Sequence, residues 1–249
     1  MKIIAYILLM IIPMCATEQG VTKETGDSAY AKGDYAAATA AYETLLAEQG
    51  EAPELYYNLG NAYYKSNEIA KAILNYERAL LLDPNDPDTR FNLELAQSKT
   101  VDKVSEGYNI FFVQWLYAVI NSLDINTWSV IGIISFIIFL VSLIMLFFGK
   151  SISLRKGSFA AAIFMFVLAL FANLSALHHH HKLTHRTSAI ILVPSVTAKS
   201  TPDESGTNLF VLHEGRKVEV TDDTMQHWKE ISLEDGTVGW VPAGAIEVI

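Results

Sequence analysis

The sequence has a single cysteine and a low share of charged residues, and both features restrict what the protein can be. One thiol among 249 residues excludes an internal disulfide, an iron–sulfur cluster and a structural zinc site with several thiolate ligands. Charged residues make up 18 % of the chain, whereas soluble domains average about 25 %. Because hydrophobic residues reach 51 % and the mean hydropathy is +0.26, we expect part of the chain to contact lipid.

Basic residues are also in the minority, with 18 lysines and arginines against 27 acidic residues and a net charge of −9. Binding to nucleic acid depends on neutralising phosphates, so we expect no nucleic-acid partner. The sequence contains no phosphate-binding glycine loop, no dinucleotide glycine motif, no zinc-protease helix and no Gly-x-Ser-x-Gly motif. We therefore expect a protein that is not an enzyme and that uses no cofactor and no metal.

Residues 1–16 have the pattern of a secretory signal peptide. Lys2 precedes the apolar run 3–12, which as a helix would reach about 15 Å and cover half of a bilayer core. Ala16 is a small residue at a plausible cleavage point. Cys15 leaves two alternatives, because it is either removed with the signal peptide or lipidated as the first residue of the mature chain.

Two long apolar runs, 125–149 and 157–181, predict transmembrane helices. Neither run contains Asp, Glu, Lys or Arg, and each has about the 20 residues that a helix needs to cross the hydrocarbon core. The loop 150–156 between them carries three basic residues and no acidic one, and short basic loops remain in the cytoplasm. The prediction is a hairpin in a bacterial inner membrane, with the segments on both sides of it in the periplasm.

Residues 105–124 form a third apolar segment, which is uncharged from Gly107 to Leu123 and rich in aromatic side chains. We interpret it as an amphipathic helix that lies at the membrane surface. The alternative is that it spans the bilayer, since its uncharged part is at the lower limit of the spanning range. In that case the segments before and after the hairpin would lie on opposite sides of the membrane.

Residues 17–104 contain an internal repeat of 34 residues. The positions that recur at this spacing are Gly26 and Gly60, Tyr30 and Tyr64, Ala38 and Ala72, and Tyr42 and Tyr76. This pattern resembles the tetratricopeptide repeat (TPR) family, in which pairs of antiparallel helices stack on one another. A further helix beginning at Pro87 resembles the capping helix that closes such arrays.

The TPR resemblance implies a concave peptide-binding face lined by the first helix of each repeat. Mapped onto this sequence, the face would contain Lys23, Asp27, Tyr30, Tyr57, Asn61, Tyr64, Lys65 and Phe91. Tyrosine rings supply contact area and amides bind a peptide backbone, so this composition suits a protein partner. The alternative is that these residues are only the solvated side of the helices.

From residue 187 onward the sequence alternates with a period of two, which predicts five or six short strands and a hairpin turn at Asp235-Gly236. The order of the motifs Ala198–Asp203, His213-Glu214-Gly215 and Gly239-Trp240-Val241 resembles a bacterial-type SH3 domain. The resemblance implies a small all-β SH3-like barrel at 187–249 that binds peptides or cell-wall polymers through aromatic grooves. Trp228 is a candidate ligand contact and equally a candidate core residue, and we expect Trp240 in the core.

Four adjacent histidines, residues 178–181, and His185 follow the second apolar run. Adjacent residues on a helix point in different directions, so interfacial polar side chains explain the cluster adequately. A sensor of metal or acid is the alternative.

The order of TPR repeats, membrane hairpin and SH3-like module on one chain resembles the BatE proteins of bacterial aerotolerance (Bat) operons. That family is held to be a membrane scaffold beside von Willebrand factor A-domain Bat proteins and a MoxR-type AAA+ ATPase, and the resemblance implies the same partners here. We therefore expect a multidomain, membrane-anchored adaptor in an envelope complex linked to oxygen or stress tolerance. The alternative is a peptidoglycan-binding module that recruits hydrolases.

Overall fold

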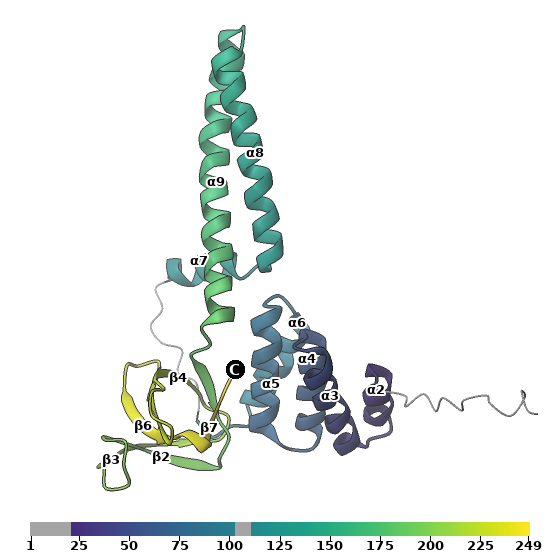
Figure 1. Ribbon diagram of the computed structural model, residues 1–249, viewed down its shortest axis with the longest axis vertical. Helices are drawn as coiled ribbons and strands as arrows, with labels where there is room; N and C mark the ends of the chain where they lie inside the picture. The colour runs from purple at the N-terminus through teal and green to yellow at the C-terminus, as the bar shows by residue number, and fades with distance from the viewer. Residues whose placement is uncertain (1–20, 103–110) are drawn as a thin grey trace, which may run out of the picture.

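The computed structural model describes residues 21–102 and 111–249. The predicted signal peptide and Cys15 lie outside these residues, as does the beginning of the segment 105–124. The described chain forms a helical repeat region, a long two-helix hairpin and an antiparallel sheet (Figure 1). The repeat region and the sheet lie at the same end of the hairpin, and the connection between its two long helices lies at the other end (Figure 1).

The repeat region consists of two helix pairs and a single closing helix. The helices are α2 (Lys23–Ala31), α3 (Tyr35–Gln49), α4 (Pro53–Lys65), α5 (Ile69–Leu82) and α6 (Pro87–Gln97). This arrangement confirms the helix pairs and the closing helix that the 34-residue repeat predicts. Helix α5 ends just before Pro84, which cannot donate a backbone hydrogen bond and disfavours helix in the residue before it.

A glycine and an aspartate stabilise the turn between α2 and α3 in the first repeat. Gly33 has a φ of +80°, a conformation that costs glycine little and other residues more. The Asp34 side chain then accepts a hydrogen bond of 3.1 Å from the backbone nitrogen of Ala37, and so caps the N-terminus of α3.

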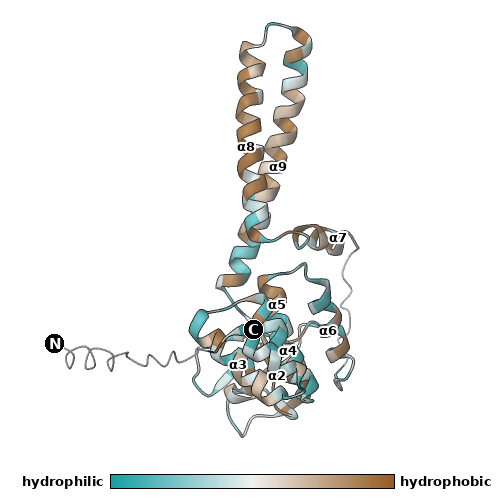
Figure 2. Ribbon diagram, turned by 90° about the vertical axis from the view of Figure 1, so that its right-hand side faces the viewer, coloured by the Kyte–Doolittle hydropathy of each residue, from teal (hydrophilic) through white to brown (hydrophobic). Residues whose placement is uncertain are grey.

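Helices α8 (Ile125–Phe148) and α9 (Ile152–Thr184) are long and apolar enough to cross a membrane. Small residues fill the contact between them, as is typical of helices that pack in lipid. The buried small residues include Gly132, Ser135 and Ser142 of α8 and Ala162, Ala169 and Ala172 of α9. Only 17 % and 22 % of their most apolar windows are buried, and large apolar side chains such as Ile133 and Phe164 are exposed. Most of the hairpin is hydrophobic along its length (Figure 2).

Helix α9 begins earlier than the second apolar run. The predicted loop 150–156 is shorter in the structure, because α9 starts at Ile152 and includes Arg155 and Lys156. The hydroxyl of Ser151 accepts a hydrogen bond of 3.1 Å from the backbone nitrogen of Leu154 and caps the helix. The three basic residues therefore remain at the closed end of the hairpin.

Helix α7 (Phe111–Ile120) lies across the base of the hairpin rather than along it (Figures 1 and 2). Its ten residues reach about 15 Å, which is half of a bilayer core. The carbonyl oxygen of Ile120 accepts a hydrogen bond of 2.8 Å from Trp128 Nε1 and lies 3.0 Å from His179 Nε2. Side chains from both α8 and α9 thus fix the end of α7.

The C-terminal part is one antiparallel sheet of seven strands, where the sequence pattern predicted five or six. The strands are β1 (Ser188–Ile191), β2 (Ser195–Lys199), β3 (Asn208–His213), β4 (Lys217–Asp222), β5 (Trp228–Ser232), β6 (Val238–Pro242) and β7 (Ile246–Val248). Strands β2 and β7 were missed because β2 is rich in polar residues and β7 has three residues. The predicted turn at Asp235-Gly236 joins β5 to β6, with Gly236 at a φ of +83°.

The sheet is not closed, so the predicted SH3-like barrel is not confirmed. The strand order is β3-β2-β6-β5-β4-β1-β7, and β3 and β7 are the two edges. We attribute the open sheet to the way the C-terminal end of the chain is held. Ile249 and Ile190 are buried among the side chains of the repeat region, so β7 is held beside β1 and away from β3.

The sheet packs directly on α5 and forms one body with the repeat region. Lys217 pairs with Glu77 of α5 at 2.7 Å, and Arg78 donates to Glu247 at 2.9 Å and to the Val248 carbonyl at 2.7 Å. At the other side of the interface, the Asp102 carboxylate lies 2.8 Å from both the backbone nitrogen and the Nδ1 of His213.

Candidate functional site

A groove of about 270 Å³ lies on the face of the repeat region formed by α2, α4 and α6. It is lined by Tyr30, Tyr57, Asn61, Tyr64, Lys65, Tyr76, Asn92 and Leu95. Residues 57, 61 and 64 follow one another at helical spacing, so α4 presents them on a single side. The structure therefore brings together five of the predicted site residues, namely Tyr30, Tyr57, Asn61, Tyr64 and Lys65.

Asn61 lies at the centre of the polar contacts in this groove. Its Oδ1 accepts hydrogen bonds from the Tyr76 hydroxyl at 2.8 Å and from Asn92 Nδ2 at 2.9 Å. Asn92 Nδ2 also lies 3.3 Å from the Tyr57 hydroxyl. These contacts orient the Asn61 amide so that its Nδ2 group has no hydrogen-bond partner among the described residues. The groove thus offers a fixed donor that suits a backbone carbonyl of a bound peptide.

Aromatic side chains form the walls of the groove. The rings of Tyr57 and Tyr76 lie 6.3 Å apart, and Lys99 Nζ lies 4.1 Å from the centre of the Tyr64 ring, in the geometry of a cation–π contact. Burial raises the pKa of Tyr76 above its ordinary value, and burial likewise raises the pKa of Tyr30. These phenols are therefore neutral, and the positive charges of the groove come from Lys65 and Lys99.

Two predicted site residues, Lys23 and Phe91, lie outside the lining of the groove. Lys23 Nζ is 2.8 Å from a carboxylate oxygen of Glu54 and 3.2 Å from one of Asp27. The hydrogen bond to Glu54 raises the pKa of Lys23, with that to Asp27 next in size. Phe91 is on α6 and is 65 % exposed.

Asp27, the eighth residue assigned to the concave face, is also engaged within the protein. It accepts a hydrogen bond of 2.6 Å from the hydroxyl of Tyr42. This contact is the counterpart, 34 residues earlier, of the bond between Tyr76 and Asn61. Because Asp27 also holds Lys23, it is not left available for a ligand in the way that the amide of Asn61 is.

The sequence predicted Phe91 as the site residue of α6, but the structure places other residues of this helix at the groove. Adding 34 to residues 58, 61 and 65 gives residues 92, 95 and 99. These are Asn92, Leu95 and Lys99, which line the groove or stack on its wall. The repeat spacing therefore contained the signal that would have identified them.

The two tryptophans of the sheet lie on one face. The prediction that Trp240 lies in the core is wrong, because the core cluster of the sheet does not include it. In the register of β5 and β6, Trp228 is opposite Pro242, and Glu230 is opposite Trp240. Directly paired residues point to the same side of a sheet, so both rings lie on the side opposite to the buried Ile231 and Val241. Both tryptophans are half-buried.

The histidine cluster does not form a metal site among the described residues, where no group of three or more His, Cys, Asp or Glu side chains could hold a metal ion. The histidines instead have separate partners. His179 contacts the Ile120 carbonyl, the ring of His178 lies 5.9 Å from that of Tyr117, and His181 stacks on His185 at 4.3 Å.

Comparison with known proteins agrees with the geometry of the repeat region. No curated protein matches the chain. A family model described as tetratricopeptide repeat matches residues 24–88. The match runs from α2 into the first turn of α6, and over these residues the chain is similar to tetratricopeptide repeat proteins, which bind other proteins.

Proposed function

We propose that the protein is a membrane-anchored, non-enzymatic scaffold that binds an extended segment of another protein in the groove of α2, α4 and α6. The observation that carries this proposal is the orientation of Asn61, which lines a groove with tyrosine walls and whose Nδ2 donor has no hydrogen-bond partner among the described residues. The Nδ2 group of Asn61 would donate a hydrogen bond to a backbone carbonyl of the peptide, and the peptide would place its side chains against the rings. Lys65 and Lys99 favour acidic side chains at their end of the groove.

The test replaces the Nδ2 amino group of Asn61 with an oxygen atom. In the variant Asn61→Asp the acceptor for Tyr76 remains but the Nδ2 donor is lost. The fold tolerates this exchange, because Asp27 holds the equivalent bond to Tyr42 in the first repeat. Recovery of the partner that co-purifies with the full chain from its native membrane should fall about tenfold, the effect of one lost hydrogen bond.

The matched control is the reverse exchange, Asp27→Asn, at the equivalent position that does not line the groove. Partner recovery with this variant should stay close to that of the native chain. Equal recovery with Asn61→Asp and with the native chain would exclude the groove as the binding site.

At a finer level, we propose that the scaffold serves a Bat-type envelope complex related to oxygen or stress tolerance, with von Willebrand factor A-domain proteins and a MoxR-type ATPase as partners. The order of the three parts along the chain supports this proposal. We also propose that the repeat region and the sheet lie in the periplasm. Lys150, Arg155 and Lys156 at the opposite end of the hairpin support this orientation, since basic loops stay in the cytoplasm.

A second candidate function is binding of cell-wall polymer by the sheet, and the shared face of Trp228 and Trp240 favours it. Two half-buried indole rings on the same face of a sheet offer apolar surface to the rings of a sugar chain. The full chain with Trp228→Ala and Trp240→Ala should then sediment less with purified peptidoglycan than the native chain. Unchanged sedimentation would exclude these two tryptophans as the binding site for the polymer, and the protein-binding groove would remain the candidate functional site.

A further inference from the structure

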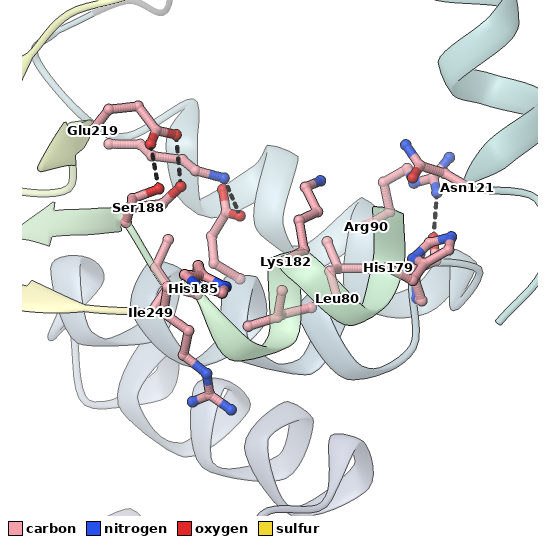
Figure 3. A pocket seen from close by; sticks show the side chains of 15 residues that line it. Leu80, Arg90, Asn121, His179, Lys182, His185, Ser188, Glu219 and Ile249 are labelled. Atoms are coloured by element: carbon pink, nitrogen blue, oxygen red, sulfur yellow. Dashed lines mark hydrogen bonds and ion pairs between the residues drawn. The ribbon is translucent and has the colours of Figure 1, made fainter. Parts of the chain in front are cut away.

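A second cavity, of about 350 Å³, lies where the repeat region, the hairpin and the sheet meet (Figure 3). Leu80 of α5 and Arg90 of α6 line it from the repeat region, Lys182 comes from the last turn of α9, and Ser188 and Glu219 come from the sheet. No single part of the chain forms this cavity, and it exists only because the three parts are packed together.

The two glutamate carboxylates that line the cavity have partners within the protein, whereas one of its lysines does not. Glu77 is held by Lys217 at 2.7 Å, and Glu219 accepts hydrogen bonds of 2.8 Å from the hydroxyls of Thr187 and Ser188. Lys182, by contrast, has no hydrogen bond and no ion pair with any described residue (Figure 3).

Arg90 is the second cation that lacks a carboxylate partner among the described residues. Arg90 Nη2 donates a hydrogen bond of 2.7 Å to the carbonyl of Pro84, and the other guanidinium donors have no hydrogen-bond partner among the described residues. Lys182 and Arg90 line the same cavity, and together they supply two unpaired positive charges on a chain whose net charge is −9.

The depth of Lys182 relative to the membrane surface follows from its position on α9. His179, three residues earlier, lies 3.0 Å from the carbonyl of Ile120 at the end of α7. Helix α7 exposes Phe111, Phe112 and Trp115, the kind of surface that sits at the boundary of headgroups and acyl chains. At 1.5 Å per residue, Lys182 lies about 4.5 Å further along α9 than that contact, toward the sheet. With α7 at the headgroup boundary, Lys182 would lie at about the level of the lipid phosphates.

We propose that this cavity binds the phosphate group of an anionic phospholipid in the leaflet on which α7 lies. Lys182 and the free donors of Arg90 would bind the phosphate oxygens through charge-assisted hydrogen bonds. Leu80 and Leu81 give the cavity an apolar border toward the acyl chains. The bound lipid would fix the angle between the hairpin and the folded body beneath it. This inference rests on the membrane placement proposed above.

The test measures phospholipid that remains bound to the full chain. The protein is extracted in mild detergent from membranes that contain phosphatidylglycerol, and the bound lipid is counted by native mass spectrometry. The native chain should retain one phosphatidylglycerol, and the variant Lys182→Gln with Arg90→Gln should retain at least tenfold less. The variant Lys182→Arg with Arg90→Lys keeps both charges and should restore retention. Lys32→Gln, an exposed lysine of the first repeat, is the matched control and should have no effect.

A second arm adds inorganic phosphate at millimolar concentration to distinguish a lipid headgroup from free phosphate. Retained phosphatidylglycerol supports the lipid as the source, and its displacement supports a site that also takes free phosphate. Equal retention by the native chain and the Lys182→Gln, Arg90→Gln variant overturns the inference while leaving the scaffold intact. Recovery of the native chain in the soluble fraction without detergent would overturn the membrane placement as well.

Discussion

Tyr76 packs its ring directly against the α-carbon of Gly60. A Cβ atom added to Gly60 would lie 2.6 Å from Tyr76 Cε1, and one added to Gly26 would lie 2.5 Å from the same atom of Tyr42. The contact between a glycine and a tyrosine 16 residues later thus occurs once in each repeat. It explains why these two residue types recur together at the spacing of 34.

The first prediction concerns this contact. Gly60→Ala should destabilise the repeat region by about 1–3 kcal/mol, the cost of overpacking a well-packed core. The helix propensity of alanine offsets at most about 1 kcal/mol of it. Hydrogen exchange of the α4 and α5 amides in the detergent-solubilised full chain measures the change. Gly244→Ala, at an exposed glycine with no atom within 4 Å of the added Cβ, is the control and should leave the exchange unchanged.

The second prediction concerns pH. Arg186 donates two hydrogen bonds to the Glu51 carboxylate, at 2.7 and 2.5 Å, and this contact lowers the pKa of Glu51 below its ordinary value of 4.5. Since the pKa is depressed in the folded state, the stabilisation is present above pH 4.5 and is lost as the pH falls through the folded-state pKa. Glu51→Gln should therefore lower the melting temperature at pH 7 and have a progressively smaller effect below pH 4.5. A constant difference between the variant and the native chain at all pH values would contradict this account.

The third prediction concerns the docking of the sheet on the repeat region. Ile249 is 5 % exposed and lies in the core of the repeat region, whereas the adjacent Val248 is 42 % exposed. Ile249→Ala should cost about 2–4 kcal/mol, as removal of a buried aliphatic side chain does, and Val248→Ala should cost well under 1 kcal/mol. Faster hydrogen exchange in β1, β7 and α5 of the Ile249 variant alone would show that the two parts have separated.

The fourth prediction concerns topology. With Cys15 replaced by serine, a cysteine introduced at Ser153 in the closed end of the hairpin should react with a membrane-impermeant thiol reagent only after the cells are broken. A cysteine at the exposed Ser28 of α2 should react in cells whose outer membrane alone is permeable. Labelling of both positions from the same side would contradict a hairpin that crosses the bilayer.

Local patterns in the sequence were sufficient for the secondary structure of most of the chain. The 34-residue repeat identified the helix pairs, because the small residues Gly60 and Ala72 at helix contacts have their counterparts in Gly26 and Ala38. The absence of charge in 125–149 and 157–181 identified the hairpin, because burying a charge in lipid is costly. The alternation failed at β2 and β7, which are too polar or too short to show it. In α6 the repeat spacing identified Phe91, the counterpart of Tyr57, but not Asn92, Leu95 and Lys99, which the structure places at the groove.

The sequence by itself determined the periodic elements: the stacked helix pairs, the apolar hairpin and most of the strands. These depend on contacts between residues at fixed spacing, such as Gly60 with Tyr76. Only the tertiary structure decided that the sheet stays open, that it packs on α5, and that Lys182 and Arg90 line one cavity. Those features depend on contacts between residues more than 90 positions apart, such as Arg186 with Glu51, and no local pattern encodes them.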